Sequence, residues 1–437
     1  MSGSFRNRKL WIARSSIFKK QSVWDTALAN GDIDTLLRQN SPAFPDVNEN
    51  YEDDMDCGGE YAFARQITSR LWQFNLGFYG TVSEMAGWLA LCLGADTKTG
   101  SQANEVQTAT NSDIDGGSAA ISIVIDGTTY TTAAVAWNAL AAAWQTALQA
   151  VLGTGNATVS GTLATGLVVT YAGDLANYNL PLATFGAGFT DGGSPITPTF
   201  VQTTPGSNNT HSLTTNGTSD QGPQTSMIYG FDTDSTLPLK AKNIVGGSWK
   251  VSGSAAPSQR KILCEVQLFG SGDVAEVSGY SKPSCDNSPH LRFADTHIKI
   301  ASTFYGAQSF SLQFNNNILI NDDPYTTSDI DPTRLERGDR RTTATLEVFG
   351  SRGDALATLV ESNTESAYEL ILGKPKDRLQ CFAPAMHLQK RKPFIGFSGE
   401  ANRSTLNIDG EAFLSGDAGS PFNAIASIDQ STAFLTS

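Results

Sequence analysis

Apolar and polar residues alternate along several stretches of this chain, and in a few others the apolar residues recur at helical spacing. In one clear stretch every second position is apolar, at Ile262, Cys264, Val266 and Leu268. This alternation is typical of a strand with one buried face. The segment "LWQFNLGFYG" (71–80) also favours a strand, and "SEMAGWLALCLG" (83–94) predicts an apolar helix after it. The pattern predicts a mainly β protein with few helices.

A complete set of elements is predicted between Asn104 and Gly193. "AISIVIDGTTYTTAAVAW" reads as a hairpin with an Asp126-Gly127 turn, and "NALAAAWQTALQAVLG" as a helix that ends at Gly153. Three short strands follow in "ATVSG", "LVVTYAG" and "LATFGAG". This order predicts a small α+β domain, and the polar stretch after it, residues 197–225, is expected to be a loop.

The charge distribution marks the same region. No Lys or Arg occurs between Lys98 and Lys240, while nine acidic residues do. The rest of the chain carries 30 basic and 43 − 9 = 34 acidic residues, a net charge of −4, so −9 of the total of −13 comes from this window. Two different compositions are joined in one chain, which indicates an inserted domain.

Outside the insert, two patterns occur twice in the same order. "FYGTVSEMAGWLALCLG" (78–94) and "VFGSRGDALATLVESN" (348–363) each place an aromatic-Gly pair and an acidic residue before an apolar run. Further on, residues 249–272 and 394–416 each contain a Ser-Gly pair, an alternating strand and a second Ser-Gly pair. We interpret this as an internal duplication.

Composition narrows the class of protein. The 437 residues exceed a usual single core, and the abundance of Gly, Ser and Thr favours β-structure with many turns. No apolar run reaches the ~18 residues of a membrane helix. The cysteines, which show no CxxC pair or disulfide ladder, are expected to be reduced thiols in a protein assembled in cytoplasm: Cys57, Cys92, Cys264, Cys285 and Cys381. The basic N-terminus makes a poor signal peptide; a transit peptide is the weaker alternative to an arm that docks on a neighbouring subunit.

These strand and turn patterns resemble the tail tube proteins of long-tailed bacteriophages. The likeness lies in "AKNIVGGSWKVSGSAAPSQRKILCEVQLFGSG", in "QSFSLQFNNNILI" and in "GDRRTTATLEVFG". The insert, with "NEVQTAT" and "VAWNALAAAWQTALQAVLGTGNATVSG", is similar to a decoration-like domain of phage tail proteins. The resemblance implies small β-sandwich domains with a flanking helix, whose sheets join into a ring around a channel for double-stranded DNA.

The fold expected on this basis is mainly β, with two tandem tail-tube β-sandwich or barrel domains, each with a flanking helix, and a small inserted α+β domain. The first tube domain is assigned to residues 1–103 and 194–280, with an N-terminal arm over about 1–50. The inserted outward-facing domain is assigned to 104–193 and the second tube domain to 281–437. The second copy departs from the commonest tube protein and predicts a trimer with pseudo-sixfold symmetry, with a hexamer as the alternative.

The resemblance also implies the partners. The chain is expected to bind itself within and between rings, the tape measure protein, and the tail terminator and tail tip proteins. Double-stranded DNA is expected to pass through the lumen without sequence-specific contacts, and no membrane partner is expected. The localisation implied is the virion tail, assembled in the cytoplasm of a host bacterium.

The sequence offers no pattern for catalysis. The histidines His211, His290, His297 and His387 lie in unrelated contexts without metal-ligand spacing. "GAGFTDGG" (186–193) is expected to be a turn, and the acidic run from Asn321 to Asp331 lacks the spacing of a calcium loop. Two Arg-Gly-Asp tripeptides begin at Arg337 and Arg352, and we discount adhesion through them. No catalytic, cofactor-binding or metal-binding residue is therefore predicted, and no cofactor.

The acidic composition, with a pI near 4.8, argues against tight DNA binding and suits a wall along which DNA slides. The basic runs Arg6–Lys20 and Lys390–Lys392 are expected to face acidic surfaces of adjacent rings. Two alternatives remain. One is an extracellular β-rich adhesin or carbohydrate-binding module, and the other is an enzyme with an unrecognised site.

Overall fold

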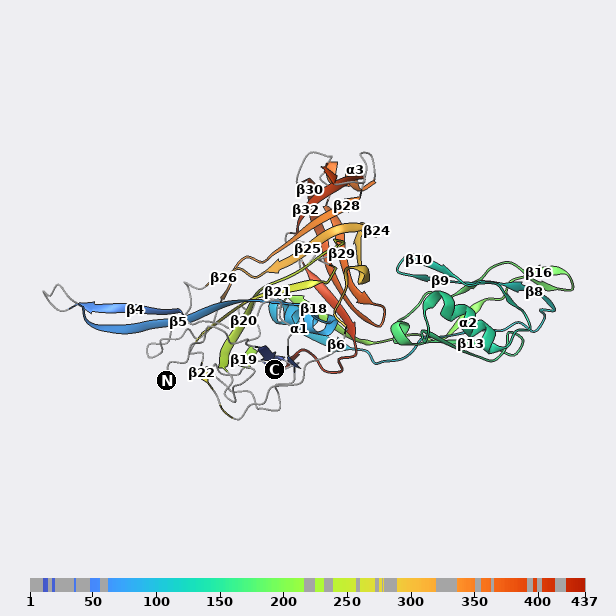
Figure 1. Cartoon of the computed structure of the whole chain (residues 1–437), viewed down its shortest axis with the longest axis horizontal. Coiled ribbons are helices and arrows are strands. Elements are labelled where there is room, and N and C mark those ends of the chain that lie inside the picture. Colours follow the sequence, from blue (N-terminus) through green and yellow to red (C-terminus); the bar gives the residue numbers. More distant parts are fainter. Residues whose placement is uncertain are drawn as a thin grey trace.

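The computed structural model of the chain describes residues 11–14, 18–19, 35–36, 48–55, 62–215, 225–231, 239–256, 260–271, 275–276, 278, 289–319, 336–349, 355–362, 365–390, 396–398, 403–412 and 422–436. The protein is mainly β, as predicted, and its large sheet is built from antiparallel pairs. Figure 1 shows a central β structure, the inserted segment extending from one side in green, and the β4–β5 hairpin extending from the other in blue.

One layer of the central structure is an antiparallel sheet with the strand order β4–β5–β21–β20–β25–β28–β32–β31. The bounds are β4 Asn48–Met55, β5 Ala62–Phe78, β20 Leu239–Ser254, β21 Leu263–Ser271, β25 Ala307–Asn315, β28 Arg341–Phe349, β31 Gly396–Ser398 and β32 Arg403–Ala412. The four alternate apolar residues from Ile262 to Leu268 are all buried, which confirms the strand predicted there.

The second layer has the order β24–β23–β29–β30–β33–β18–β6. The bounds are β6 Gly94–Thr99, β18 Asn209–Thr215, β23 Thr296–Ile300, β24 Thr303–Tyr305, β29 Glu365–Lys374, β30 Asp377–Lys390 and β33 Asn423–Ile428. The first part of β30 pairs with β33, and its last part, Met386–Lys390, pairs with β32. This long strand therefore joins the two layers into a sandwich-like structure.

Helix α1, Val82–Leu93, packs against strands of both layers. It is apolar around its whole circumference, so it is stable only when buried on every side. Thr81 and Glu84 form a capping box at its start, and Gly94 ends it with a φ of 100°. The Trp249 Nε1 donates a hydrogen bond to the Met85 carbonyl oxygen at 3.1 Å. These contacts fix the helix in one hydrophobic core that runs from Trp72 to Phe434.

Strand order repeats within the first layer. The group β4–β5–β21–β20 is followed by β25–β28–β32–β31, and in both groups the second strand in the sheet is followed along the chain by a helix. That helix is α1 in the first group and α3, Ala355–Glu361, in the second. β20 and β25 pair directly, so the two halves share one sheet and one core.

The inserted unit has its own helix, three small sheets and a separate core. Its elements are β7 Val106–Ala109, β8 Gly116–Ala119, β9 Ile121–Ile125, β10 Thr128–Thr131, β11 Val135–Ala136, α2 Ala141–Leu152, β12 Ala157–Ser160, β13 Leu167–Tyr171, η3 Gly173–Leu175, β14 Thr184–Phe185, β15 Phe189–Asp191, β16 Ser194–Ile196 and β17 Phe200–Thr204. The predicted hairpin turn and the predicted helix stop at Gly153 are confirmed. Trp144 and Leu148 bury the inner face of α2.

The expectation of a polar loop over residues 197–225 is wrong for β17 and β18, Phe200–Thr204 and Asn209–Thr215, while residues 216–224 lie outside the described part of the chain. β17 pairs with β7, and β18 pairs with both β6 and β33, because alternate residues such as Phe200 and Leu213 are buried in the two cores. Strand pairing in the inserted unit thus extends past Gly193 to Thr204. β6 and β18 form a two-stranded stem, closed by mutual backbone hydrogen bonds of 2.8 Å between Ala103 and Ser207.

The remaining described elements are short or lie near the termini. They are β1 Trp11–Arg14, β2 Phe18–Lys19, β3 Thr35–Leu36, β19 Thr225–Phe231, β22 Ala275–Glu276, η5 Phe293–Asp295, β26 Ile318–Leu319, β27 Glu336–Arg337 and β34 Leu435–Thr436. β2 pairs in parallel with β34, so the two ends of the chain meet. Most of the predicted N-terminal arm lies outside the described residues.

Candidate functional site: a polar sheet face and an anchored inserted unit

The face of the first layer that points away from the core is polar. Along six adjacent strands, the residues that alternate with buried ones are half-buried or exposed: Gln73, Asn75, Lys250, Ser252, Glu265, Gln267, Ser309, Ser311, Gln313, Asn315, Arg341, Thr343, Thr345, Glu347, Asp409 and Glu411. We call this set the polar sheet face. It ends at a small apolar cluster made of Leu71, Val245, Phe269 and Ile318.

Charge on the polar sheet face is sparse, and each of its two basic side chains lies near an acidic one. The Lys250 Nζ lies 2.7 Å from a Glu265 carboxylate oxygen on the neighbouring strand, and Ser309 donates to Glu347 at 3.1 Å. The face has two basic and four acidic side chains, and the others carry hydroxyl or amide groups. A surface of this kind offers few cationic contacts to phosphate groups.

Both ends of the strand order are edge strands within the described part of the chain. β4 pairs there with β5, and β31 pairs with β32. An edge strand presents backbone N–H and C=O groups that another strand can bind. Because the strand order repeats, the edge strands β31 and β4 correspond to β20 and β25, which pair with each other inside the chain. A second copy of the chain could supply the strand that each edge lacks.

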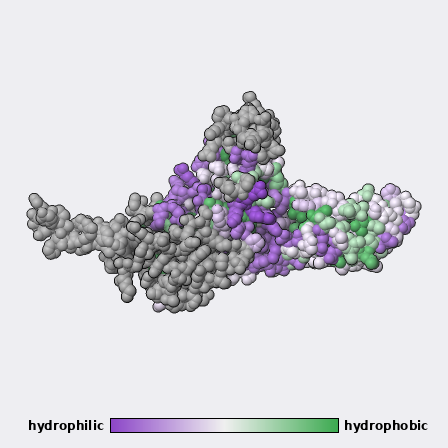
Figure 2. Space-filling view, in the orientation of Figure 1, coloured by the Kyte–Doolittle hydropathy of each residue, from purple (hydrophilic) through white to green (hydrophobic). Residues whose placement is uncertain are grey.

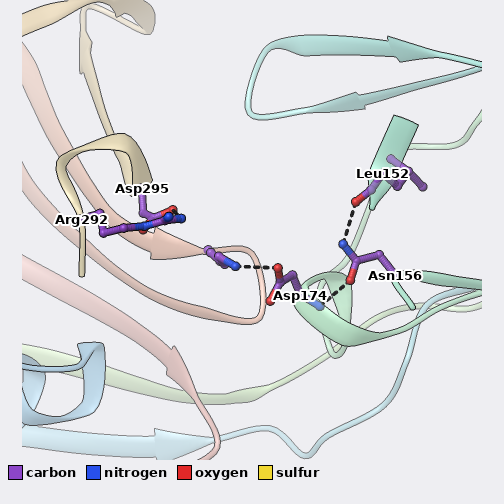
Figure 3. A network of polar contacts seen from close by, with 6 residues as sticks. Leu152, Asn156, Asp174, Arg292 and Asp295 are labelled. Atoms are coloured by element: carbon purple, nitrogen blue, oxygen red, sulfur yellow. Dashed lines mark hydrogen bonds and ion pairs between the residues drawn. The ribbon is translucent and has the colours of Figure 1, made fainter. Parts of the chain in front are cut away.

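A single hairpin turn of the second layer anchors the inserted unit. The turn between β29 and β30 brings Lys374 to Asp174 of η3, with 2.6 Å between the Nζ and Oδ2 atoms. In Figure 3, the Asp174 backbone N–H also donates to Asn156, whose side chain binds the Leu152 carbonyl at the end of α2. The Asn208 amide donates to the Lys376 carbonyl at 2.7 Å, which ties the stem to the same turn.

Arg378, at the start of β30, makes the most buried contact with the inserted unit. Its Nη2 lies 2.6 Å from Oδ2 of Asp126 in the β9–β10 turn, and the two side chains are 5% and 10% exposed. The guanidinium also lies over the Tyr178 ring, 4.8 Å from its centre, and Nη1 donates to the Tyr178 hydroxyl. One side chain thus binds two loops of the inserted unit.

Beside this ion pair lies a cavity of about 420 Å³ between the β9–β10 turn and the β23–β24 hairpin. Its wall includes the aromatic side chains of Phe293, Phe304, Tyr305 and Phe310, and Gly127 lies close to the Phe304 ring. His297 also lines it, 3.9 Å from Asp126. Burial lowers the pKa of His297, and the Asp126 carboxylate opposes that shift. The cavity thus lies where the inserted unit packs against the central structure, beside the ion pair of Arg378 and Asp126.

Surface polarity differs between the two parts. On the face shown in Figure 2, the described surface of the central structure is mostly hydrophilic, whereas apolar surface gathers on the inserted unit. Four of the six exposed large apolar side chains among the described residues belong to that unit: Val124, Leu140, Leu182 and Val201. Among the described residues, the inserted unit therefore presents the more apolar surface.

The four histidines lie at four separate places. His211 is buried beside Asp96, His297 lines the cavity, His387 lies 2.9 Å from Glu365, and His290 contacts the Tyr79 ring. Within the described residues no three His, Cys, Asp or Glu side chains converge in the manner of a metal site.

Three of the five cysteines fall in the described part of the chain, where Cys92, Cys264 and Cys381 are buried free thiols. Burial raises the pKa of Cys264 and of Cys381, so these thiols are unreactive packing groups.

Several predicted features lie outside the described residues, namely Cys57, Cys285, Asn321–Asp331, the tripeptide at Arg352 and most of both basic runs. The "GAGFTDGG" segment contains β15 and the turn after it. Sequence reasoning missed Asp126 and Arg378 as partners. They are 252 positions apart, and the only signal was that a lone Asp occupies a hairpin turn in a segment without basic residues.

No helix in the described part of the chain is long and apolar enough to span a membrane. No model of a known protein family matches the sequence, and no curated protein matches it.

Proposed function

We propose that this chain is a structural subunit that assembles with copies of itself into stacked rings, forming a bacteriophage tail tube that conducts double-stranded DNA. The observation that carries the proposal is the repeated strand order of the first layer. Two groups of four strands follow one another in the same sense, joined at the β20–β25 pair. A repeat that advances along a sheet can be continued by further copies until the sheet closes on itself.

The repeat favours a ring of three chains. Each contributes eight strands to the order, so three give 3 × 8 = 24 strands and six equivalent groups. With strands about 4.8 Å apart and tilted by about 40°, such a barrel is about 48 Å across between backbones. That leaves room for a DNA duplex after side chains are added. Closure also removes the exposed edges at β4 and β31, and covalent linkage of two groups reduces the entropic cost of assembly.

The polar sheet face suits the channel wall. In a closed ring the apolar side of the sheet stays against α1 and the second layer, so the hydroxyl and amide side chains line the lumen. Its two cationic side chains, Lys250 and Arg341, each lie near a glutamate, at 2.7 Å and 3.9 Å. DNA phosphates would find few unpaired cations and could slide.

The inserted unit would decorate the outside of the ring. It leaves the second layer, on the opposite side of the core from the polar sheet face, through the β6–β18 stem. A trimer therefore carries three outer lobes, one for every two sheet groups. The further partners of this proposal are the tape measure protein inside the tube and the terminator and tip proteins at its ends.

Negative-stain electron microscopy of the purified full chain tests the proposal. Rings or tubes with a central hole are expected, and rotational averages of end-on views should show three outer lobes around a six-unit wall. Six equivalent lobes would refute the trimer but keep the tube. Monomeric protein at every concentration and salt condition tried would refute the tube itself.

A proline pair in β31 sharpens this test. Successive backbone N–H groups of a strand point to opposite sides. Of the two variants Phe397→Pro and Ser398→Pro, one therefore removes an N–H that points toward β32, and the other removes an N–H on the free edge, where a second copy would bind. The variant that retains the wild-type melting temperature should be folded and unable to form rings. The same pair of changes in β10, an edge strand of the inserted unit in the described part of the chain, is the control: of Thr129→Pro and Tyr130→Pro, the variant that retains the melting temperature should still assemble.

A further inference from the structure

His211 and Asp96 form a completely buried polar pair in the second layer. His211 lies on β18 and Asp96 on β6, both side chains are 0% exposed, and the Nδ1 atom lies 3.1 Å from Oδ2. The other ring nitrogen, Nε2, lies 2.9 Å from the backbone carbonyl oxygen of Gln430. The Asp96 Oδ2 also accepts the Phe434 backbone N–H at 2.6 Å, and the Phe434 ring packs on the imidazole at 4.8 Å.

This geometry defines the protonation of the pair. A carbonyl oxygen only accepts, so Nε2 must carry a proton. Nδ1 lies 3.1 Å from Oδ2 and 3.3 Å from Oδ1 of Asp96, and an ionised carboxylate only accepts, so the ionised pair has a second proton on Nδ1, whereas a neutral pair would hold that proton on Asp96. Both ring nitrogens donate only in the imidazolium form. A neutral ring would turn a nitrogen lone pair toward one of the two oxygens inside a site without water access, which is costly.

The groups bound by the pair belong to the last segment of the chain, 429–436. Gln430 and Phe434 are held through the imidazolium and the carboxylate, and β34 directly follows Phe434. β34 pairs in parallel with β2, Phe18–Lys19. The pairing of β2 with β34 therefore lies directly next to the groups that His211 and Asp96 hold, while β1 is attached separately through β19.

We propose that His211 and Asp96 are a proton-held latch for the two ends of the chain. With the imidazolium present, the C-terminal segment stays on the β6–β18 stem and keeps β2 beside it. When base removes the proton to water, one of the two hydrogen bonds of His211 becomes a repulsive contact, and the segment detaches. The latch goes beyond the proposed function and holds whether or not the chain forms a tube.

The other charged groups around the pair are already engaged. On β6, Lys98 is opposite His211 in the strand register and donates its ammonium to the Gly100 carbonyl. On β33 the register partner is Ala426, which is uncharged. In the C-terminal segment, the Asp429 carboxylate binds Gln102 at 2.6 Å and Lys376 at 3.5 Å. These contacts leave Asp96 as the counterion of His211.

Two measurements on the unaltered chain test the latch. Ring-nitrogen NMR at neutral pH should show both nitrogens of His211 protonated. Hydrogen exchange of peptide 429–436, corrected for the intrinsic effect of pH, should become faster as His211 loses its proton. The expected acceleration is about tenfold or more, because the loss of one charge-assisted hydrogen bond changes the opening equilibrium by about that factor. Peptide 262–268 in the core should stay protected.

Variants separate the latch from general stability. Asp96→Asn should leave His211 with one proton, on Nε2, because the amide can donate to Nδ1; exchange of peptide 429–436 should then no longer depend on that proton and lose its corrected pH dependence, whereas His387→Gln should change neither. If Asp96→Asn does not fold, the measurements on the unaltered chain still decide. A single protonated nitrogen on His211 at neutral pH, or terminal protection that persists up to global unfolding, overturns the proposal.

Discussion

Arg378 and Asp126 are 252 positions apart in the chain and form an ion pair of 2.6 Å with little exposure to solvent. The pair joins the start of β30 to the tip of the β9–β10 hairpin. Tyr178 holds the other side of the guanidinium, so the side chain is fixed between two loops of the inserted unit. Arg378 therefore helps to fix the orientation of that unit, together with the contacts of Lys374 and Lys376 in the neighbouring turn.

Replacing Arg378 with Met should loosen the inserted unit. The change keeps most of the side-chain volume but leaves the Asp126 carboxylate without its partner in a poorly hydrated place. Breaking a buried pair in this way costs about 3 kcal/mol. Chemical denaturation followed by Trp fluorescence should report the loss, and small-angle scattering should show a wider range of shapes.

The double variant Arg378→Met with Asp126→Asn is the matched control. It removes both charges, so it should recover much of the lost stability. Lys374→Met breaks a half-exposed pair and should cost well under 1 kcal/mol. Equal losses for Arg378→Met and Lys374→Met would contradict the role given to Arg378.

Local elements could be predicted where the signal lies in neighbouring residues. The Asp126-Gly127 turn adopts positive φ values of 49° and 77°, as the favoured hairpin turn requires, and Gly94 and Gly153 end the two longer helices. The alternation in β21 correctly predicted its buried face. These features depend on backbone preferences and on one-sided burial, which a short window of sequence contains.

The strands in residues 197–225 could not be predicted in the same way. His211 and Asn209 are polar yet buried, because partners more than 100 positions away satisfy their hydrogen bonds: Asp96 for the histidine and Asp429 for the asparagine. A polar residue in the sequence indicates solvent unless its partner is known. The Arg378 contact was missed for the same reason.

Removal of the inserted unit between Ala103 and Ser207 should leave the central fold intact. These residues already exchange two backbone hydrogen bonds of 2.8 Å, and the β6–β18 ladder follows them. A two-residue Gly-Ser link in place of residues 104–206 therefore closes a ready-made hairpin. Circular dichroism and electron microscopy should show a folded protein that still assembles, with a thinner outline.

A shorter deletion of 104–193 gives the contrast. It removes β7 but keeps β17, so Val201 and its neighbours lose their strand partner and the buried Phe200 loses its core. This variant should aggregate. Aggregation of the longer deletion as well would mean that the central structure depends on the inserted unit.

Asp377, in the turn that anchors the inserted unit, should lower stability at neutral pH. Burial raises its pKa above the ordinary value of 3.8, and the Asp429 carboxylate raises it further. Because the folded pKa is the higher one, the favourable contribution of the protonated acid is complete below pH 3.8 and is lost as pH rises through the folded value. Asp377→Asn should therefore melt at a higher temperature than the natural chain at pH 7.

The difference in melting temperature should disappear at about pH 3, where both side chains are neutral. In an Asp429→Asn background the gain at pH 7 should shrink, because the repelling charge is already gone. A gain that is the same at pH 3 and pH 7 would show that the amide stabilises the turn by hydrogen bonding and that the charge of Asp377 has no such effect.

Arginines on the polar sheet face should convert a sliding surface into a binding one. Gln73 and Thr343 are exposed positions of β5 and β28, so Gln73→Arg with Thr343→Arg adds two cations per chain without disturbing the core. Each phosphate neutralised steepens the dependence of DNA binding on salt by about 0.9 in a plot of log K against log salt concentration. Assembled tubes of this variant should therefore retain DNA at low salt and release it as salt rises.

Thr129→Arg with Thr184→Arg places the same charges on exposed positions of the inserted unit and serves as the control. If the polar sheet face lines the channel, DNA held by the first variant should be protected from nuclease, because the surrounding wall excludes the enzyme. DNA attracted by the control should be degraded, since it lies outside. Equal nuclease sensitivity of both would place the polar sheet face on the outer surface and contradict the assignment of the lumen.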